Sequence, residues 1–396
     1  MSLAATRPGA LRLGIFVTHP IQYFAPLWRQ LAATPGIDLT VHFFSDHSVR
    51  GGLDRDFGVN VSWDVPILEG YRHEFISRHA NLARPLGVAL PDAGARVTRR
   101  HFDTVMVHGY AHRFEWQIVR AARRHGVRTL LRGELTDMPR MGRRSRLKQL
   151  ARAAYLRWYY GHIDTFCYIG QDARQHLRRR GVPESRLFFA PYSVDTALFT
   201  AQQRLYERET CRAALGIQDE QLVILFSGKL IERKAPRVLI EAIRQMVSST
   251  RVVLLMMGEG ELRAEVEAMG RPLLGERLHL LGFVNQSALG RYYRAADVFV
   301  LPSHFETWGL VVNEAMQFGL PAIVSSKVGC RHDLIIEGET GLVFPQGDAS
   351  ALARCLQRFH DDPVLAKRLG ANAVQHVSAY STTRSADGVR RALGVM

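Results

Sequence analysis

Two glutamates and two lysines in the second half of the chain have the types and spacing expected for binding a phosphorylated, hydroxyl-rich ligand. Glu306 and Glu314 are separated by seven residues, and both follow an apolar run at residues 298–301. Lys229 and Lys234 follow an earlier apolar run. A carboxylate accepts hydrogen bonds from two adjacent hydroxyl groups, such as a ribose diol, and hydrogen bonds to charged groups contribute about 1.5–3 kcal/mol each. We therefore predict that the glutamates bind hydroxyls and the lysines bind two phosphates.

Small residues beside these side chains favour close approach of an anion. Gly309 and Leu310 are expected to open the helix that carries Glu314, so their N–H groups and the positive end of the helix dipole can face a diphosphate. Gly228 permits a tight turn directly before Lys229. The structural alternative is a solvated turn with surface lysines, together with glutamates that merely flank a helix start.

The stretch Gly-Glu-Gly-Glu-Leu-Arg at residues 258–263 begins like a dinucleotide-binding fingerprint, but Arg263 stands where the third glycine belongs. We therefore expect Gly258 to contact a nucleotide base instead of marking a hydride-transfer site. No Asp-x-Asp pair stands at the end of a predicted strand. Lysines, rather than a metal ion, are expected to neutralise the diphosphate, and no cofactor is predicted.

The elements that position these residues are short apolar strands alternating with helices. This pattern is typical of parallel sheets covered by helices on both faces. The predicted strands are residues 13–17, 39–44, 104–107, 129–131, 166–169, 223–226, 252–257, 278–281, 298–301, 322–324 and 342–344. The predicted fold is α/β with two Rossmann-like, doubly wound domains, 1–195 and 196–375, and a last helix within 376–396 that packs back on the first domain. Ligands of such sheets bind beyond the carboxyl ends of the strands.

Three polar residues of the first half stand at such strand ends. His19, His108 and Glu134 each follow one of the predicted strands. We expect His19 and Glu134 to line the acceptor side of a site. The alternative for both histidines is a hydrogen-bonded loop residue without a role in binding.

Composition suggests a basic protein with anionic partners. The 396 residues include 52 Lys and Arg against 37 Asp and Glu, a formal net charge of +15. Such a surface favours phosphorylated substrates, acidic lipid headgroups or nucleic acid, although Arg also serves as a solubilising residue. The four cysteines lie far apart, and no run of about 18–20 apolar residues or signal-peptide pattern is present. A cytoplasmic protein is expected.

Residues 140–157 form a basic amphipathic segment. Leu147, Leu150, Ala151 and Ala154 share one helical face, and most of the arginines lie elsewhere. A helix of this kind can rest on an anionic membrane surface, which would make the protein peripheral at the inner face of the cell membrane. The alternative is a helix that packs its apolar face into the core.

The motif around Glu306 and Glu314, preceded by a Gly-Lys-Leu loop with Arg233 and Lys234, resembles the signature of the family 4 glycosyltransferases. The stretch at residues 338–345, GETGLVFP, fits the same family. The resemblance is close over residues 223–348 and loose in the first half, where it is nearest to bacterial polysaccharide-cluster enzymes. It implies the GT-B fold, in which two Rossmann-like domains face each other across a cleft, and transfer of a sugar with retained anomeric configuration.

The resemblance also implies roles for individual residues. Glu306 is expected to meet the donor sugar, Glu314 the ribose, and Lys229 and Lys234 the diphosphate, while His108 lies near the donor sugar. The family more often has Arg at position 229, and Lys keeps the charge but loses the bidentate fork. The family often has Pro where Thr307 stands, and paired glycines in the loop at 18–24, where this chain has none.

The implied partners are a nucleotide-diphosphate sugar and a glycan, lipid-linked saccharide or small-molecule acceptor. One alternative is a GT-B epimerase, which acts on the nucleotide sugar without an acceptor. Another is a nucleic-acid-binding protein, suggested only by the net charge. Because no basic groove with interleaved aromatic residues is evident, no nucleic-acid partner is predicted.

Overall fold

A computed structural model gives the fold and describes residues 9–54, 59–77, 88–137, 146–247 and 249–395. The chain forms two compact units. Unit 1 consists of Met1–Gly51, Pro66–Tyr192 and Thr382–Met396, and unit 2 consists of Gly52–Val65 and Ser193–Ser381. Each unit is built on one parallel sheet, so the predicted α/β class with two doubly wound domains is confirmed.

The sheet of unit 1 has seven strands in the order β5-β2-β1-β6-β7-β8-β9. Their bounds are β1 Leu11–Val17, β2 Ile37–Phe43, β5 Arg72–Phe75, β6 Thr104–Val107, β7 Arg128–Arg132, β8 Thr165–Tyr168 and β9 Leu187–Phe189. From β1 to β2 the chain proceeds toward one edge of the sheet, and from β6 to β7 it proceeds toward the opposite edge. Because such crossovers are right-handed, the helices of the two directions cover opposite faces of the sheet.

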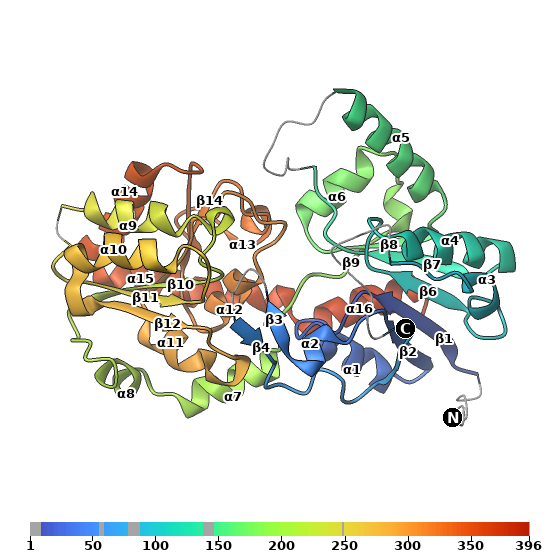
Figure 1. Ribbon diagram of the computed structural model, residues 1–396, viewed down its shortest axis with the longest axis horizontal. Coiled ribbons are helices and arrows are strands. Elements are labelled where there is room, and N and C mark those ends of the chain that lie inside the picture. The colour runs from blue at the N-terminus through green and yellow to red at the C-terminus, as the bar shows by residue number, and fades with distance from the viewer. Residues whose placement is uncertain (1–8, 55–58, 78–87, 138–145, 248, 396) are drawn as a thin grey trace. The chain divides into compact units, whose positions relative to one another are not determined.

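The helices of unit 1 follow this rule. On one face, α1 packs against the last helix, α16, and α4 covers β6 and β7 on the other (Figure 1). Burial of the apolar side of α1, including Trp28 and Leu31, fixes it against β2. The bounds are α1 Ala25–Ala33, α2 His47–Arg50, α3 Ala93–Arg96, α4 Arg113–His125, α5 Arg146–Gly161, α6 Gln171–Arg178 and α16 Thr382–Leu393.

The sheet of unit 2 has six strands in the order β12-β11-β10-β13-β14-β15. Their bounds are β10 Leu222–Ser227, β11 Val252–Met257, β12 Leu278–Gly282, β13 Val298–Leu301, β14 Ala322–Ser325 and β15 Gly341–Phe344. Strands β10, β11 and β13 are buried along their whole length. Apolar residues of these strands form one core with α9, α10, α14 and α15.

The helices of unit 2 cover both faces of this sheet. In Figure 1, α9, α10 and α14 lie on one side of the strands and α8 and α11 on the other. The bounds are α7 Thr196–Leu205, α8 Arg208–Ala213, α9 Pro236–Arg244, α10 Arg263–Leu274, α11 Leu289–Ala295, α12 Leu310–Gln317, α13 Arg331–Leu334, α14 Ala349–Asp361 and α15 Pro363–Val377. None of the helices in the described part of the chain is long and apolar enough to cross a lipid bilayer.

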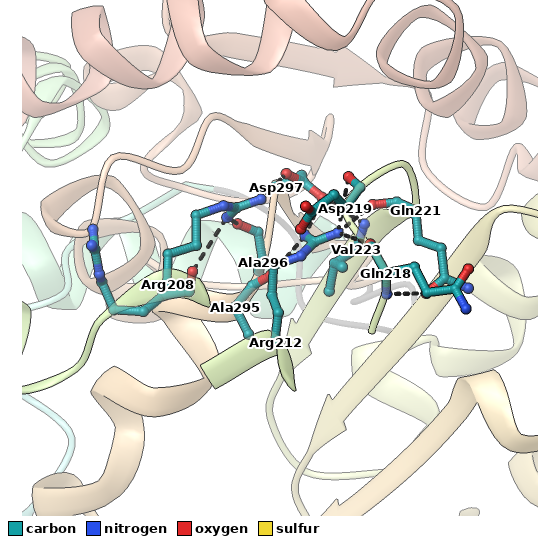
Figure 2. Close-up of polar contacts among 10 residues, drawn as sticks. Arg208, Arg212, Gln218, Asp219, Gln221, Val223, Ala295, Ala296 and Asp297 are labelled. Carbon is teal, nitrogen blue, oxygen red and sulfur yellow. Dashed lines mark hydrogen bonds and ion pairs between the residues drawn. The ribbon is translucent and has the colours of Figure 1, made fainter. Parts of the chain in front are cut away.

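A polar network fixes the two central strands of unit 2 at their amino-terminal ends (Figure 2). Asp297, directly before β13, accepts hydrogen bonds from the backbone N–H of Val223 at 2.8 Å and from Arg208 at 2.6 Å. Arg212, which is 3% exposed, reaches the same carboxylate at 3.2 Å. These bonds join β13, β10 and α8. They fix the position of β13 relative to β10, and therefore also the relative positions at which the loops leave the carboxyl ends of the two strands.

The contacts place two boundaries within a few residues of those expected from 1–195, 196–375 and 376–396, return the last helix to the first unit, and add one departure in the first half. The chain passes between the units at Tyr192 and Ser193 and again at Ser381 and Thr382, and residues 52–65 of the first half belong to unit 2. Within those residues, β3 (Gly52–Asp54) and β4 (Val59–Val61) form an antiparallel pair.

Side-chain bonds explain why residues 52–65 belong to unit 2. The carboxylate of Asp64 accepts hydrogen bonds from the N–H and hydroxyl of Ser287. The side-chain amide of Asn285 donates to the carbonyl of Ser62 at 2.6 Å, and the rings of Trp63 and Phe283 are 5.9 Å apart.

Each sheet reverses its winding direction at one point, between β1 and β6 in unit 1 and between β10 and β13 in unit 2. The loops at the carboxyl ends of the two strands diverge there, which leaves room for a ligand. Lys229 and Lys234 follow β10, and Glu306 follows β13. His19 follows β1, and His108 follows β6. The predicted residues therefore lie at the ligand-binding edges of their sheets.

Candidate functional site

The loop after β10 holds Lys234 close to Gly228. A Cβ atom added at Gly228 would lie 3.4 Å from Cε of Lys234, so the lysine side chain runs back across the glycine. The short 3-10 turn Glu232–Lys234 and Ala235, in the left-handed region with φ of 50°, direct the chain into α9. Lys229 is half-buried in the same loop.

Glu306 and Lys234 are in direct contact. The Nζ atom of Lys234 lies 2.5 Å from Oε1 of Glu306, and Nη1 of Arg233 lies 2.7 Å from the same oxygen. The hydroxyl of Ser303 donates to Oε1 at 3.3 Å. Glu306 is 8% exposed. Its two cationic partners offset the free-energy cost of removing the carboxylate charge from water. Neither Arg233 nor Ser303 was predicted as a site residue.

Backbone bonds connect the loops after β10, β13 and β14. The N–H of His304 donates to the carbonyl of Arg233 at 2.9 Å, and the Arg233 guanidinium donates to the carbonyl of Phe305 at 3.1 Å. The N–H of Glu306 donates to the carbonyl of Lys327 at 3.0 Å. Glu306 is therefore held by its main chain as well as by its side chain.

Glu314 lies in the second turn of α12 and is almost completely buried. It is 1% exposed, and the hydroxyl of Tyr293 donates to its Oε2 at 2.7 Å. Gly309 caps the helix with φ of 102°, and a Cβ there would lie 3.1 Å from Cδ2 of Leu301. The helix start at Gly309 and Leu310 thus lies directly beyond β13, as the sequence predicts.

The loop after β11 packs backbone to backbone against the loop after β10. A Cβ at Gly258, whose φ is 139°, would lie 1.9 Å from the carbonyl oxygen of Gly228. A Cβ at Gly260 would lie 2.4 Å from the carbonyl oxygen of Leu230. Only glycine fits at these positions, which gives a packing reason for the glycine-rich pattern and places Gly258 beside the loop of Lys229.

His108, beyond β6 in unit 1, has two buried ring nitrogens without a hydrogen-bond partner in the described chain. Its ring lies 4.9 Å from that of Phe24. Burial, and then the nearby charge of Arg132, lower the pKa of His108 well below its usual value. The imidazole is therefore neutral at pH 7, so it exchanges hydrogen bonds rather than carrying charge.

Arg132, the last residue of β7, lies in the same predicted strand-end segment as Glu134 and is a buried cation. It is 1% exposed, and its Nη2 atom donates to the carbonyl of Pro191 and to the hydroxyl of Ser385, each at 3.2 Å. Its Nε and Nη1 atoms have no hydrogen-bond partner among the described residues. Its guanidinium carbon lies 4.9 Å from the centre of the Tyr192 ring. A strand-end arginine is visible in the sequence, but its burial is not.

The other two predicted residues of unit 1 have different surroundings. His19 lies with its Nδ1 atom 2.9 Å from the Thr18 hydroxyl and its ring 4.6 Å from that of His47. Burial, and then the charges of His47 and His112, lower the pKa of His19 to about 3. Glu134 is exposed. His19, His108 and Glu134 thus stand beyond β1, β6 and β7, which are neighbours in the sheet.

Helix α5 presents several of its apolar side chains to solvent. Leu147 is 77% exposed, Leu150 is 68% exposed and Trp158 is 53% exposed, whereas Leu156 and Tyr159 on the opposite side are buried. The alternative prediction of a core-packing helix is therefore wrong for the face of Leu147 and Leu150, although the helix does pack through Leu156 and Tyr159. Of the segment 140–157, residues 140–145 lie outside the described residues.

Within the ranges that the structure describes, no three His, Cys, Asp or Glu side chains gather in a way that could hold a metal ion.

Two family models match the chain in succession. The model described as "Glycosyl transferase 4-like domain" matches residues 20–193, and the model described as "Glycosyl transferases group 1" matches residues 207–376. Their boundary falls near the passage from unit 1 to unit 2 at Tyr192. Together they account for most of the sequence.

A D-inositol 3-phosphate glycosyltransferase from Thermomonospora curvata is 31% identical over 232 residues, which cover 55% of this chain and 53% of that protein. The chain thus spans about half the length of the curated relatives it matches.

Among solved structures, HepE from Anabaena in complex with UDP and glucose is 16% identical, with a TM-score of 0.70 and 97% and 99% of the two chains covered. A putative UDP-N-acetylglucosamine 2-epimerase from Listeria monocytogenes is 16% identical, with a TM-score of 0.64 and 97% of both chains covered. These likenesses concern the fold. Because a protein described as an epimerase shares it, the distinction between transfer and epimerisation depends on the site.

Proposed function

This chain belongs to the family 4 glycosyltransferases, and from that premise we propose that it transfers a sugar from a nucleotide-diphosphate sugar to an acceptor with retention of anomeric configuration. The observation that carries the proposal is the contact of Glu306 with Lys234 at the point where the unit 2 sheet reverses direction. A carboxylate accepts hydrogen bonds from a sugar hydroxyl, and an adjacent cation binds the neighbouring phosphate.

The proposed chemistry uses preorganised positive charge. Negative charge develops on the departing diphosphate, and Lys229, Lys234 and the N–H groups at Gly309 and Leu310 stabilise it. Glu306 accepts hydrogen bonds from the sugar, so the anomeric carbon is oriented relative to the leaving oxygen. No metal ion is required in this scheme, because the lysines supply the compensating charge.

The remaining predicted residues bind the other parts of the substrates. Glu314, in the second turn of α12, accepts from the ribose hydroxyls, and Tyr293 orients its carboxylate. Gly258 lets the base approach the backbone. Neutral His108 binds the donor sugar, and His19 and Glu134 contact the acceptor.

Substitution at the two charged positions tests the proposal. A thermal-shift panel of nucleotide-diphosphate sugars identifies the donor, because a ligand that binds only the native state raises its stability. Lys234→Ala is expected to lower turnover of that donor about 100-fold to 1000-fold, and Glu314→Ala is expected mainly to weaken donor binding. Lys367→Ala, an exposed lysine of α15, is the matched control. Full sugar transfer by both site variants would reject the assignment.

An epimerase remains the alternative enzyme, since a protein described as one shares the fold. The two activities differ in their need for an acceptor. A transferase releases nucleoside diphosphate faster when the acceptor is added, whereas an epimerase converts the nucleotide sugar without releasing nucleotide. Release measured with and without candidate acceptors separates them. A gel shift with random DNA across a salt series tests the nucleic-acid reading suggested by the net charge.

We also propose that α5 brings the protein to an anionic membrane, which favours a lipid-linked acceptor and a peripheral location at the cytoplasmic face. The support is the exposure of Leu147, Leu150 and Trp158 on a helix that also carries Lys148 and Arg157. Apolar side chains enter the interface while basic groups meet lipid phosphates.

Vesicle sedimentation tests this contact. The wild-type chain is expected to sediment with vesicles that contain phosphatidylglycerol, and Leu147→Ser combined with Trp158→Ser is expected to reduce the bound fraction several-fold. Val364→Ser removes an apolar side chain of α15 that is 68% exposed, a value between those of Leu147 and Trp158, and is expected to have no effect. Equal binding of all three proteins would refute the membrane contact.

A further inference from the structure

Arg233 and the nearby Arg237 pair with different carboxylates. Its side chain is 40% exposed, yet its Nη1 atom lies 2.7 Å from Oε1 of Glu306 and 3.1 Å from the carbonyl oxygen of Phe305. Arg237, one helical turn later, pairs instead with Glu232 and Glu265 on the surface. Arg233 therefore contacts the candidate site, whereas Arg237 forms ion pairs on the surface.

The contacts of Glu306 are concentrated on one of its two oxygens. Lys234, Arg233 and the hydroxyl of Ser303 all make their closest approach to Oε1. A carboxylate has about four lone-pair positions on its two oxygens. Because all three donors approach Oε1 most closely, Oε2 is the oxygen with the greater remaining capacity to accept from a ligand hydroxyl.

Arg233 can fix the orientation of the Glu306 carboxylate, whereas Lys234 cannot. An ammonium group is a compact point charge that rotates freely, whereas the guanidinium is planar and donates in fixed directions. Because the same Nη1 atom also meets the carbonyl of Phe305, the adjacent residue, the position of the guanidinium relative to the Glu306 backbone is fixed. The carboxylate is thereby held in one rotation about its terminal bond.

A bound diphosphate would compete with Glu306 for Lys234. In that complex Arg233 still neutralises the carboxylate, which would otherwise be a buried charge facing phosphate oxygens. We propose that Arg233 is a positioning residue that holds Glu306 so that Oε2 accepts a hydroxyl of the donor sugar. This inference rests on the proposed function, and it assigns Arg233 to recognition of the sugar rather than of the nucleotide.

Titration calorimetry with two probes of the same nucleotide tests the proposal. UDP-glucose carries the sugar and UDP does not, and GDP-mannose with GDP is the second pair. For the pair that the wild-type chain binds, Arg233→Ala is expected to weaken binding of the nucleotide sugar about 10-fold and to leave binding of the diphosphate within about twofold. Arg233→Lys restores charge without the planar fork, so an intermediate loss is expected. Arg237→Ala, the matched control, changes neither affinity.

A double-mutant cycle adds a readout that general structural damage would not produce. In the Glu306→Gln background, Arg233→Ala is expected to cause no further loss of nucleotide-sugar affinity, because it acts only through that carboxylate. Equal losses for nucleotide sugar and diphosphate, independent losses in the cycle, or unchanged binding of Arg233→Ala would each overturn the inference alone. A wild-type chain that binds neither these pairs nor any other nucleotide-diphosphate sugar of the thermal-shift panel would overturn the proposed function together with it.

Discussion

At the scale of single residues, the two glutamates of the motif differ in the groups that stabilise their buried carboxylates. Glu306 meets two cations and a hydroxyl, whereas Glu314 lies deeper and accepts a hydrogen bond from Tyr293. Their spacing and the neighbouring lysines are visible in the sequence. Arg233 was not predictable as a partner of Glu306, because its direction depends on the 3-10 turn and on the left-handed backbone of Ala235.

The unpartnered nitrogens of His108 lead to a prediction about pH. Its pKa is lowered well below 6.5 in the folded chain, so below pH 6.5 the unfolded state binds a proton that the folded state does not. Stability therefore falls as the pH decreases through that range. His108→Gln is expected to lose less stability between pH 7 and pH 5 than the wild-type chain, measured as the change in urea midpoint.

An exposed histidine provides the comparison. His101→Gln replaces a surface ring at the end of the segment before β6 and is expected to leave the pH dependence of the urea midpoint as in the wild-type chain. If His108→Gln and His101→Gln gave the same pH dependence, burial of the His108 ring would not contribute to acid sensitivity.

At the scale of elements, the strands that are buried along their whole length have the clearest signal in the sequence. β10, β11 and β13 are continuous apolar runs, and all appear where the sequence places them. β5 was missed because its sequence, Arg-His-Glu-Phe, has no apolar run, and it is held by pairing with β2 and by the contact of His42 with Glu74. β9 was missed because three residues are too few for a periodic signal.

The packing of α16 on β9 gives a prediction at this scale. A Cβ added at Gly388 would lie 1.9 Å from the carbonyl oxygen of Phe189, so helix and strand touch through their backbones. Gly388→Ala is expected to push α16 from the sheet and to cost about 1–3 kcal/mol of unfolding free energy. Gly161→Ala, at the end of α5 with open space around the added atom, is the control in chemical denaturation. Equal stability of the two variants would mean that α16 adjusts without loss.

At the scale of the whole molecule, the chain passes between its two units more often than the predicted boundaries allow. The binding of residues 52–65 to unit 2 could not be predicted, because the bonded residues Asp64 and Ser287 are 223 positions apart. No periodic pattern links such distant positions. The apolar pattern does specify the two sheets, because each strand carries its own signal.

The side-chain hydrogen bonds of Asp64 and Asn285 give a prediction about how residues 62–65 are held. The combined variant Asp64→Ala and Asn285→Ala removes the side-chain hydrogen bonds that join residues 62–65 to unit 2. Amide hydrogen exchange in that segment is expected to accelerate, while exchange in β10 and β11 stays slow. Asp92→Ala, which breaks a surface ion pair of unit 1, serves as the control. Unchanged exchange at 62–65 would show that these bonds do not hold the segment.

The hydrogen bond from Arg132 to Ser385 also sets an order of events during synthesis, because its partners are 253 positions apart. At about 5–20 residues per second, the ribosome adds the second residue roughly 13–50 s after the first. For that time β8 and β9 are without the helix that packs on them. During translation of the second unit, the nascent first unit therefore exposes the surface of β8 and β9 that α16 later covers.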